Sequence, residues 1–163
     1  MSAARRLVVI TDEVAARTSL KSAGDWPCHA GCDACCRSLA SVPEMNAAEW
    51  ARLAPAIAAL ASDARAAVDH AVAERRARGA ERPIVCPLLD ETTGLCRVYD
   101  ARPTACRTYG FYADRDGVLG CERIAARAEA DADVVWGNHD LVLRELAELG
   151  PARSLLDWLA EEK

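Results

Sequence analysis

The stretch Cys28-His29-Ala30-Gly31-Cys32-Asp33-Ala34-Cys35-Cys36 places four thiols within nine residues, and two of them are adjacent. Four further cysteines follow after a long cysteine-free segment, namely Cys86, Cys96, Cys106 and Cys121. Thiolates are soft ligands that favour zinc and iron–sulfur clusters. We therefore predict that the two groups converge in the folded chain to hold metal, with all eight cysteines as candidate ligands.

The composition indicates a folded domain in a reducing compartment. With 163 residues, of which 52% are hydrophobic, the chain can bury a core and is expected to form a single domain, 1–163. No apolar run approaches the roughly 20 residues that span a bilayer, and residues 7–10 are too short for the core of a secretory signal. We therefore expect a cytoplasmic protein, in which eight cysteines indicate metal ligands rather than disulfides.

The charge of the chain argues against two classes of partner. A net charge of −5 disfavours general binding to nucleic acids and to anionic membranes. A metal ion is the expected partner, and a protein or peptide is kept as a second candidate. The sequence leaves the oligomeric state open.

Apolar residues at helical spacing dominate the chain outside the cysteine-bearing segments. We predict helices over 12–20 with a break at 21–25, from 46 to about 55, and over 56–78, 138–149 and 152–161. Thr11 should cap the first helix, and Asn46 with Glu49 should form a capping box for the second. Pro55 is expected to kink a helix or to start a new one, because it lacks an N–H and clashes with the preceding turn. Gly79 should end the third helix.

The segment between these helices shows strand and turn signals. Residues 84–89 and 95–99 are predicted as two short strands, joined by a hairpin loop over 90–94. Asp100 is expected to cap a short helix that carries Cys106, and a loop is expected over 109–120.

The predicted fold is therefore mostly α with a small β-hairpin. It is a compact single domain in which cysteine-rich loops gather around a metal centre. The cysteine-cluster core spans about 26–123, and a C-terminal helical cover over about 130–162 packs on it.

The adjacent pair Cys35-Cys36 leaves the number of centres open. Successive side chains of an extended segment point to opposite faces, so one thiol of the pair could face each of two centres. Eight cysteines also equal two sets of four, which is the ligand number of a structural zinc site. A single centre with additional free thiols fits the spacing equally well.

The spacing Cys28-x3-Cys32-x2-Cys35 also matches the cluster-binding loop of radical S-adenosylmethionine enzymes. Two features separate this chain from them. Ala34 stands where those enzymes usually carry an aromatic residue, and the chain lacks the repeated strand–helix units of their partial barrel.

Several ordered motifs resemble the YkgJ-type cysteine-cluster family, whose signature is CxxxCxxCC. They are Cys28-x3-Cys32-x2-Cys35-Cys36, Cys86-Pro87-Leu88-Leu89-Asp90, Cys96-Arg97-Val98-Tyr99 and Arg102-Pro103-x2-Cys106-Arg107. The resemblance spans Cys28 to about Cys121 and implies a zinc- or iron-chelating domain. The family also includes flagellin lysine N-methylases, but these are longer, and we do not transfer their activity.

Arginines near the cysteines can offset the negative charge of a four-thiolate centre. Arg102 and Arg107 are expected to do so and are the predicted cofactor-binding residues. The other arginines close to a cysteine are expected at the surface: Arg37, Arg97 and Arg123. His29, next to Cys28, is expected to be a bystander, and His139 is left outside the site.

Three hypotheses of function follow. The first is a binding protein for zinc or iron, including an iron–sulfur cluster, whose one or two centres are mainly structural. The alternative is an iron–sulfur enzyme or redox protein that acts on a peptide or protein substrate, with or without S-adenosylmethionine as cosubstrate. The third is a metal-handling module with labile, exposed thiols.

Overall fold

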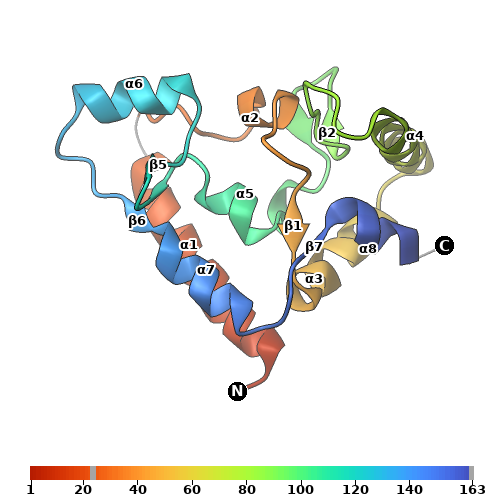
Figure 1. The fold of residues 1–163 in the computed structure, drawn as a ribbon, viewed down its shortest axis with the longest axis horizontal. Coiled ribbons are helices and arrows are strands. Elements are labelled where there is room, and N and C mark those ends of the chain that lie inside the picture. The colour runs from red at the N-terminus through yellow and green to blue at the C-terminus, as the bar shows by residue number, and fades with distance from the viewer. Residues whose placement is uncertain (23–24, 162–163) are drawn as a thin grey trace.

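The computed structural model describes residues 1–22 and 25–161 (Figure 1). Its helices are α1 (Ala3–Ser22), α2 (Ala34–Arg37), α3 (Ala47–Ala58), α4 (Ser62–Arg78), α5 (Thr104–Thr108), α6 (Glu122–Ala130), α7 (His139–Ala147) and α8 (Leu155–Glu161), with a 3-10 turn at Tyr99–Ala101. Its strands are β1 (Glu44–Met45), β2 (Leu89–Asp90), β3 (Leu95–Cys96), β4 (Tyr112–Asp114), β5 (Gly117–Val118), β6 (Gly137–Asn138) and β7 (Arg153–Ser154). This confirms the predicted class, mostly helical with small β-hairpins. None of the described helices is long and apolar enough to cross a membrane.

The first helix begins earlier than predicted. Thr11 lies in the middle of α1 rather than at its start, and its hydroxyl donates to the carbonyl of Leu7 at 2.9 Å. The prediction of a cap at Thr11 was wrong because Leu7 and Val14 lie on the buried face of the same helix. Of the predicted break, residues 23–24 lie outside the described residues, and α1 continues to Ser22.

The capping box at Asn46 is confirmed. Its side-chain oxygen accepts from the backbone of Ala48 and Glu49, both at 3.0 Å, while the Glu49 carboxylate accepts from the N–H of Asn46 at 3.2 Å. The helix continues through Pro55 to Ala58, and a separate helix, α4, starts at Ser62. The predicted single helix over 56–78 is therefore divided.

The end of α4 is also as predicted. Gly79 follows the last helical residue with a φ of 54°, a conformation that favours glycine. Arg75 is buried, and its guanidinium donates to the carbonyls of Gly79 and Glu81 at 2.7 and 2.9 Å. Arg75 thus ties the helix to the segment that follows it.

The strands form three small sheets. The predicted hairpin is present as β2–β3, with Leu89 opposite Cys96, but its strands span only two residues each instead of 84–89 and 95–99. The expected loop over 109–120 instead contains a second hairpin, β4–β5, and β6 pairs in parallel with β4. β1 pairs with β7 from the far end of the chain. The pairings of β4 with β6 and of β1 with β7 join segments distant in sequence, which local patterns do not specify.

Two further boundaries differ from the prediction. Asp100 lies in the 3-10 turn, and α5 instead starts after Pro103, so Asp100 caps no helix. The predicted C-terminal helices are present but shorter, as α7 and α8, and Asn138 caps α7 by accepting from the N–H of Leu141 at 3.0 Å. A further helix, α6, had not been predicted.

Most of the large buried side chains lie where α3, α4 and α8 meet the β2–β3 hairpin. The central members of this core are Met45, Trp50, Leu53, Ile57, Val68, Val72, Leu88, Val98, Leu155 and Leu159. Trp50 and Trp158 stack on each other with ring centroids 5.7 Å apart. Figure 1 shows α3, α4 and α8 on one side of the molecule and α1, α6 and α7 on the other, with α2 and α5 between them. The cysteine-bearing segments occupy this middle part.

Candidate metal centre

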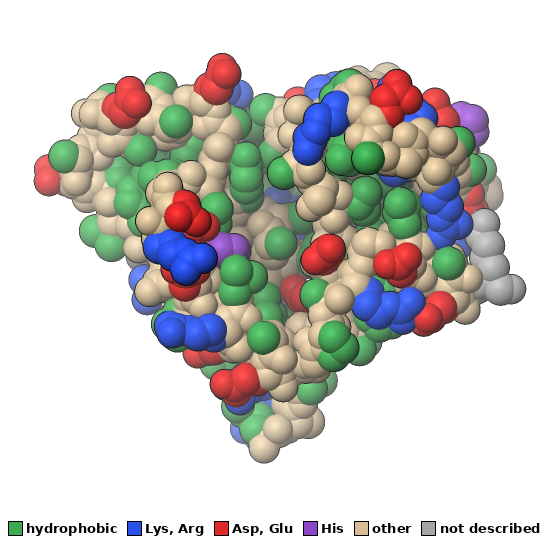
Figure 2. All heavy atoms as spheres, in the orientation of Figure 1, with side chains coloured by type: hydrophobic (Ala, Val, Ile, Leu, Met, Phe, Trp, Pro, Cys, Tyr) green, Lys and Arg blue, Asp and Glu red, His purple; other side chains and the backbone are tan. Residues whose placement is uncertain are grey.

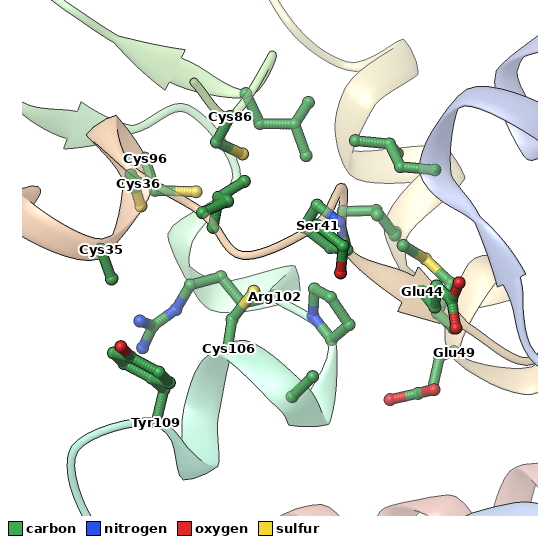
Figure 3. A pocket seen from close by; sticks show the side chains of 18 of the residues that line it. Cys35, Cys36, Ser41, Glu44, Glu49, Cys86, Cys96, Arg102, Cys106 and Tyr109 are labelled. Carbon is green, nitrogen blue, oxygen red and sulfur yellow. The ribbon is translucent and has the colours of Figure 1, made fainter. Parts of the chain in front are cut away.

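A cavity of about 570 Å³ opens between these two sides, and six of the eight cysteines line it. They are Cys32, Cys35, Cys36, Cys86, Cys96 and Cys106. Figure 2 shows the hollow near the middle of the face, with hydrophobic side chains around it. Figure 3 shows that the labelled cysteines come from separate segments of the chain. The predicted convergence of the two sequence groups on one cavity is therefore observed for these six.

Backbone hydrogen bonds hold the first and second cysteine segments together. The N–H of Cys86 donates to the carbonyl of Cys36 at 2.8 Å, and the N–H of Leu39 donates to the carbonyl of Ile84 at 2.9 Å. Cys86 in turn accepts from the N–H of Leu89, the first residue of β2, at 3.0 Å. The short helix α2 is thus fixed directly on the strand pair that carries Cys96.

Cys106 reaches the cavity from α5. Its N–H donates to the carbonyl of Pro103 at 3.0 Å in the first turn of this helix. The start of α5 is held by the buried carboxylate of Glu49, which accepts from the N–H of Thr104 at 2.9 Å. The position of Cys106 therefore depends on a residue of α3.

Cys28 and Cys121 do not line the cavity and form a second group with Cys32. The side chain of Cys28 packs so closely on Gly110 that a β-carbon there would overlap its sulfur. Burial, with a smaller effect of the nearby thiols of Cys32 and Cys121, raises the pKa of Cys28 to about 12. Arg123 is exposed, as expected, and its Nη1 lies 3.9 Å from the sulfur of Cys32.

Inside the cavity, burial opposes ionisation of the thiols. It raises the pKa of both Cys86 and Cys106 to about 12. The interaction between the neighbouring thiols of Cys35 and Cys36 lowers the pKa of Cys35 to about 6 and raises the pKa of Cys36. Several neighbouring thiols can become thiolates here only if a cation compensates them. This donor set, soft and partly desolvated, fits zinc or iron.

Arg102 is the arginine that faces the cavity thiols. Its guanidinium lies 3.6 Å from the centre of the Tyr99 ring, and its Nε donates to the Tyr99 carbonyl at 3.0 Å. The charge of Arg102 favours the thiolates of Cys96 and Cys106 by lowering their pKa, against the larger opposing effect of burial. Its role in compensating the charge of a metal centre stays a prediction.

Arg107 lies behind this site rather than in it. It does not line the cavity, and its guanidinium donates to the carbonyls of Arg102, at 2.9 Å, and of Asp100. Burial, followed by the charge of Arg102, lowers its pKa. Through these two hydrogen bonds Arg107 holds the loop that carries Arg102.

The remaining charged residues near cysteines lie at the periphery. Arg37 pairs with Asp33 at 2.6 Å, and Arg97 lies 3.5 Å from a carboxylate oxygen of Asp90. His29 is exposed, with Nδ1 2.9 Å from the Ala30 carbonyl oxygen. His139 does not line the cavity.

None of the eight cysteines, all of which the structure describes, forms a disulfide. In the described part of the chain, no three His, Cys, Asp or Glu side chains stand close enough together to hold an ion as they are placed. The thiols are gathered around a shared space but do not touch a common point.

The structure adds cavity residues that the sequence did not single out. Tyr109 lines the cavity near the thiols, and Leu143 and Leu146 of α7 line it from the C-terminal part of the chain. The apolar residues of the C-terminal helices predicted that these helices pack on the cysteine-cluster core. They did not indicate which leucines would face the cavity.

A family model described as "CxxCxxCC: Putative zinc- or iron-chelating domain" matches residues 27–131. The match includes all eight cysteines and ends before α7. No curated protein and no solved structure matches the chain.

Proposed function

The chain belongs to the CxxCxxCC family, and on that premise we propose that its eight cysteines bind zinc or iron as two neighbouring groups. The inner group consists of Cys36, Cys86, Cys96 and Cys106. The outer group consists of Cys28, Cys32, Cys35 and Cys121. We place this chemistry in the reducing cytoplasm, where thiols stay available to metals.

The observation that carries the proposal is the convergence of Cys36, Cys86 and Cys106 on one cavity from three separate segments. Thiols that serve only as small apolar side chains have no reason to gather in this way.

The assignment of Cys35 to the outer group rests on its position beside Cys36. Both lie on α2, where successive side chains diverge by about 100° around the helix axis, so the two thiols do not aim at one point. Cys35 raises the pKa of Cys28 and also those of Cys86, Cys96 and Cys106, and we assign it to the outer group because the inner group already has four members. Four thiolates complete a tetrahedral zinc site or a four-iron cluster.

Arg102 and Arg123 would offset the negative charge of the two groups, one at each. A bound zinc or iron cation would keep the thiols ionised, and an iron–sulfur cluster would in addition supply electron transfer. Because metal ligation by cysteine contributes to folding, the ion would also stabilise the loops that join α2, β3 and α5.

The test is anaerobic purification followed by elemental analysis, a visible spectrum and thermal melting before and after chelation. We expect stoichiometric zinc or iron and a clearly lower melting temperature after metal removal. A protein that binds neither metal stoichiometrically, or that melts identically after complete removal, would overturn the proposal.

The cavity also supports a second candidate, an iron–sulfur enzyme or redox protein that acts on a peptide or protein substrate. The cavity, with a volume of about 570 Å³, extends past the thiols to Glu44 and Leu146, which leaves room for a ligand beside a cluster. Visible absorption with iron and sulfide after anaerobic preparation would favour this candidate. A colourless protein with stoichiometric zinc under the same conditions would exclude it.

A further inference from the structure

The cavity has a thiol-lined end and an apolar end. Cys35, Cys36 and Arg102 lie at one side of the view in Figure 3, and Glu44 and Glu49 lie at the other. Apolar side chains supply most of the remaining wall, including Leu53, Leu88, Val98, Leu143, Leu146 and Leu155. Its volume of about 570 Å³ falls within the range of small-molecule sites, about 300–1,000 Å³.

The guanidinium of Arg102 is a preorganised hydrogen-bond donor in the wall of the cavity. Its Nε is fixed on the Tyr99 carbonyl, and one face of its guanidinium is covered by the Tyr99 ring. Among the described residues, no acceptor takes a hydrogen bond from its two terminal nitrogens. A planar guanidinium with two free parallel donors binds a carboxylate in a bidentate manner.

Two of the other polar side chains that line the cavity, Glu49 and Asn46, are already occupied. Both carboxylate oxygens of Glu49 accept backbone hydrogen bonds, from Asn46 and Thr104. The amide of Asn46 is likewise used, as it accepts within the capping box and donates to the carbonyl of Leu146 at 3.3 Å. Among the described residues that line the cavity, Arg102 is the only basic one, so a ligand with one negative charge is matched better than a dianion.

We propose that the cavity binds a small apolar molecule with a single carboxylate, held by Arg102, while its apolar body extends toward α7. This inference rests on the proposed function, because the thiols that hold the metal form the same end of the cavity. It adds the chemical class of the ligand, an amphipathic monocarboxylate.

The apolar end is built partly by residues outside the segment that matches the family. Leu143 and Leu146 lie beyond residue 131, on α7. The specificity for the body of the ligand is therefore a property of the C-terminal helices of this chain. Leu141 and Leu143 provide a matched pair, because they are 45% and 47% exposed on the same helix and only Leu143 lines the cavity.

The experiment is calorimetric titration of the metal-loaded full chain, under anaerobic conditions, with octanoate, octanol and octyl phosphate. We expect one octanoate per chain, bound about tenfold more tightly than either comparison compound, since octanol carries no charge to pair with Arg102 and octyl phosphate carries more negative charge than one guanidinium matches. Leu143→Ser should weaken octanoate binding about tenfold, and Leu141→Ser should leave it unchanged. Arg102→Lys should reduce the preference for octanoate over octanol, because lysine lacks the planar fork.

Metal content is measured on every variant, which separates the two proposals. If the unmodified protein holds neither zinc nor iron in stoichiometric amount, the proposed function is refuted, and elemental analysis shows this before any titration. Stoichiometric metal without saturable octanoate binding would overturn only the ligand proposal. Equal affinity for octanol or octyl phosphate, or equal effects of the two leucine variants, would overturn it as well.

Discussion

Glu49 of α3 and Thr104 of α5 are joined by a hydrogen bond in which the backbone N–H of Thr104 donates to Oε1 of Glu49 at 2.9 Å. The other carboxylate oxygen accepts from the N–H of Asn46 at 3.2 Å, and Glu49 is only 6% exposed. One buried carboxylate therefore completes the cap of α3 and holds the start of the helix that carries Cys106. The capping box read from the sequence also supports the proposed inner metal group.

Replacement of Glu49 tests this double role. Glu49→Ala leaves the N–H groups of Asn46 and Thr104 without their buried acceptor, and each unsatisfied group costs about 1–3 kcal/mol. We expect the free energy of unfolding, measured by urea denaturation, to fall by about 2 kcal/mol or more. Metal bound by the inner group should become easier to remove by a chelator.

Glu44→Ala is the control for this variant. Glu44 also lines the cavity, but it is exposed, and its effect on stability should lie within about 0.5 kcal/mol. Similar denaturation curves for the two variants would show that the hydrogen bond of Glu49 to Thr104 does not support α5.

The division into two groups predicts separate losses of metal. Cys106→Ser should remove the metal of the inner group and Cys28→Ser that of the outer group, because serine is a poor ligand for soft cations. Elemental analysis should show the metal content reduced by about half in each variant, and the double variant should lose nearly all of it. If either single variant loses all metal while its circular dichroism stays native, the chain holds one centre.

Local signals in the sequence correctly predicted several features of the fold. The capping box at Asn46, the stop at Gly79 and the hairpin that pairs Leu89 with Cys96 are all present. Each depends on residues only a few positions apart, so its physical cause lies within one stretch of sequence. The gathering of cysteines was predictable because soft ligands in such numbers point to a shared function.

The features that the sequence did not predict depend on contacts between distant segments. Thr11 looked like a cap, yet it lies within a helix whose buried face includes Leu7. The parallel pairing of β4 with β6 joins Tyr112 to Gly137, and no local pattern specifies it. The same limit applies to the site, since Arg107 is adjacent to Cys106 in the sequence while Arg102 is four residues away, and yet Arg102 is the one that lines the cavity. Only the packing of the loop shows which guanidinium faces the thiols.

His139 gives a prediction for the pH dependence of stability. Burial lowers its pKa below the ordinary value of 6.5, while Asp114 and Asp140 act in the opposite direction. Its Nδ1 is buried and has no hydrogen-bond partner among the described residues. The unfolded chain therefore binds a proton at His139 more readily than the folded chain does, and stability falls as the pH decreases through 6.5 toward the lowered pKa.

The measurement compares the unmodified protein with His139→Gln across this range. The unmodified protein should lose more stability than the variant between about pH 7.5 and 5.5, because glutamine does not titrate. The difference between the two curves isolates the contribution of His139 from the pH dependence of the thiols, provided that both proteins carry the same amount of metal. Parallel curves would show that protonation of His139 is not coupled to folding.

Gly110 offers the sharpest test of the outer group, because its backbone is fixed from both sides. Its carbonyl accepts from Trp26 Nε1 at 3.0 Å and its N–H donates to Leu119 at 2.6 Å, so the methyl group of Gly110→Ala must displace the sulfur of Cys28. We expect about half of the metal to be lost and the melting temperature to fall.

Gly79→Ala is the control, since Gly79 also has a positive φ, 54°, but has nothing within 4 Å of the added carbon. This variant should lose about 1 kcal/mol of stability and keep its metal. Full metal content in Gly110→Ala would mean that Cys28 is not a ligand.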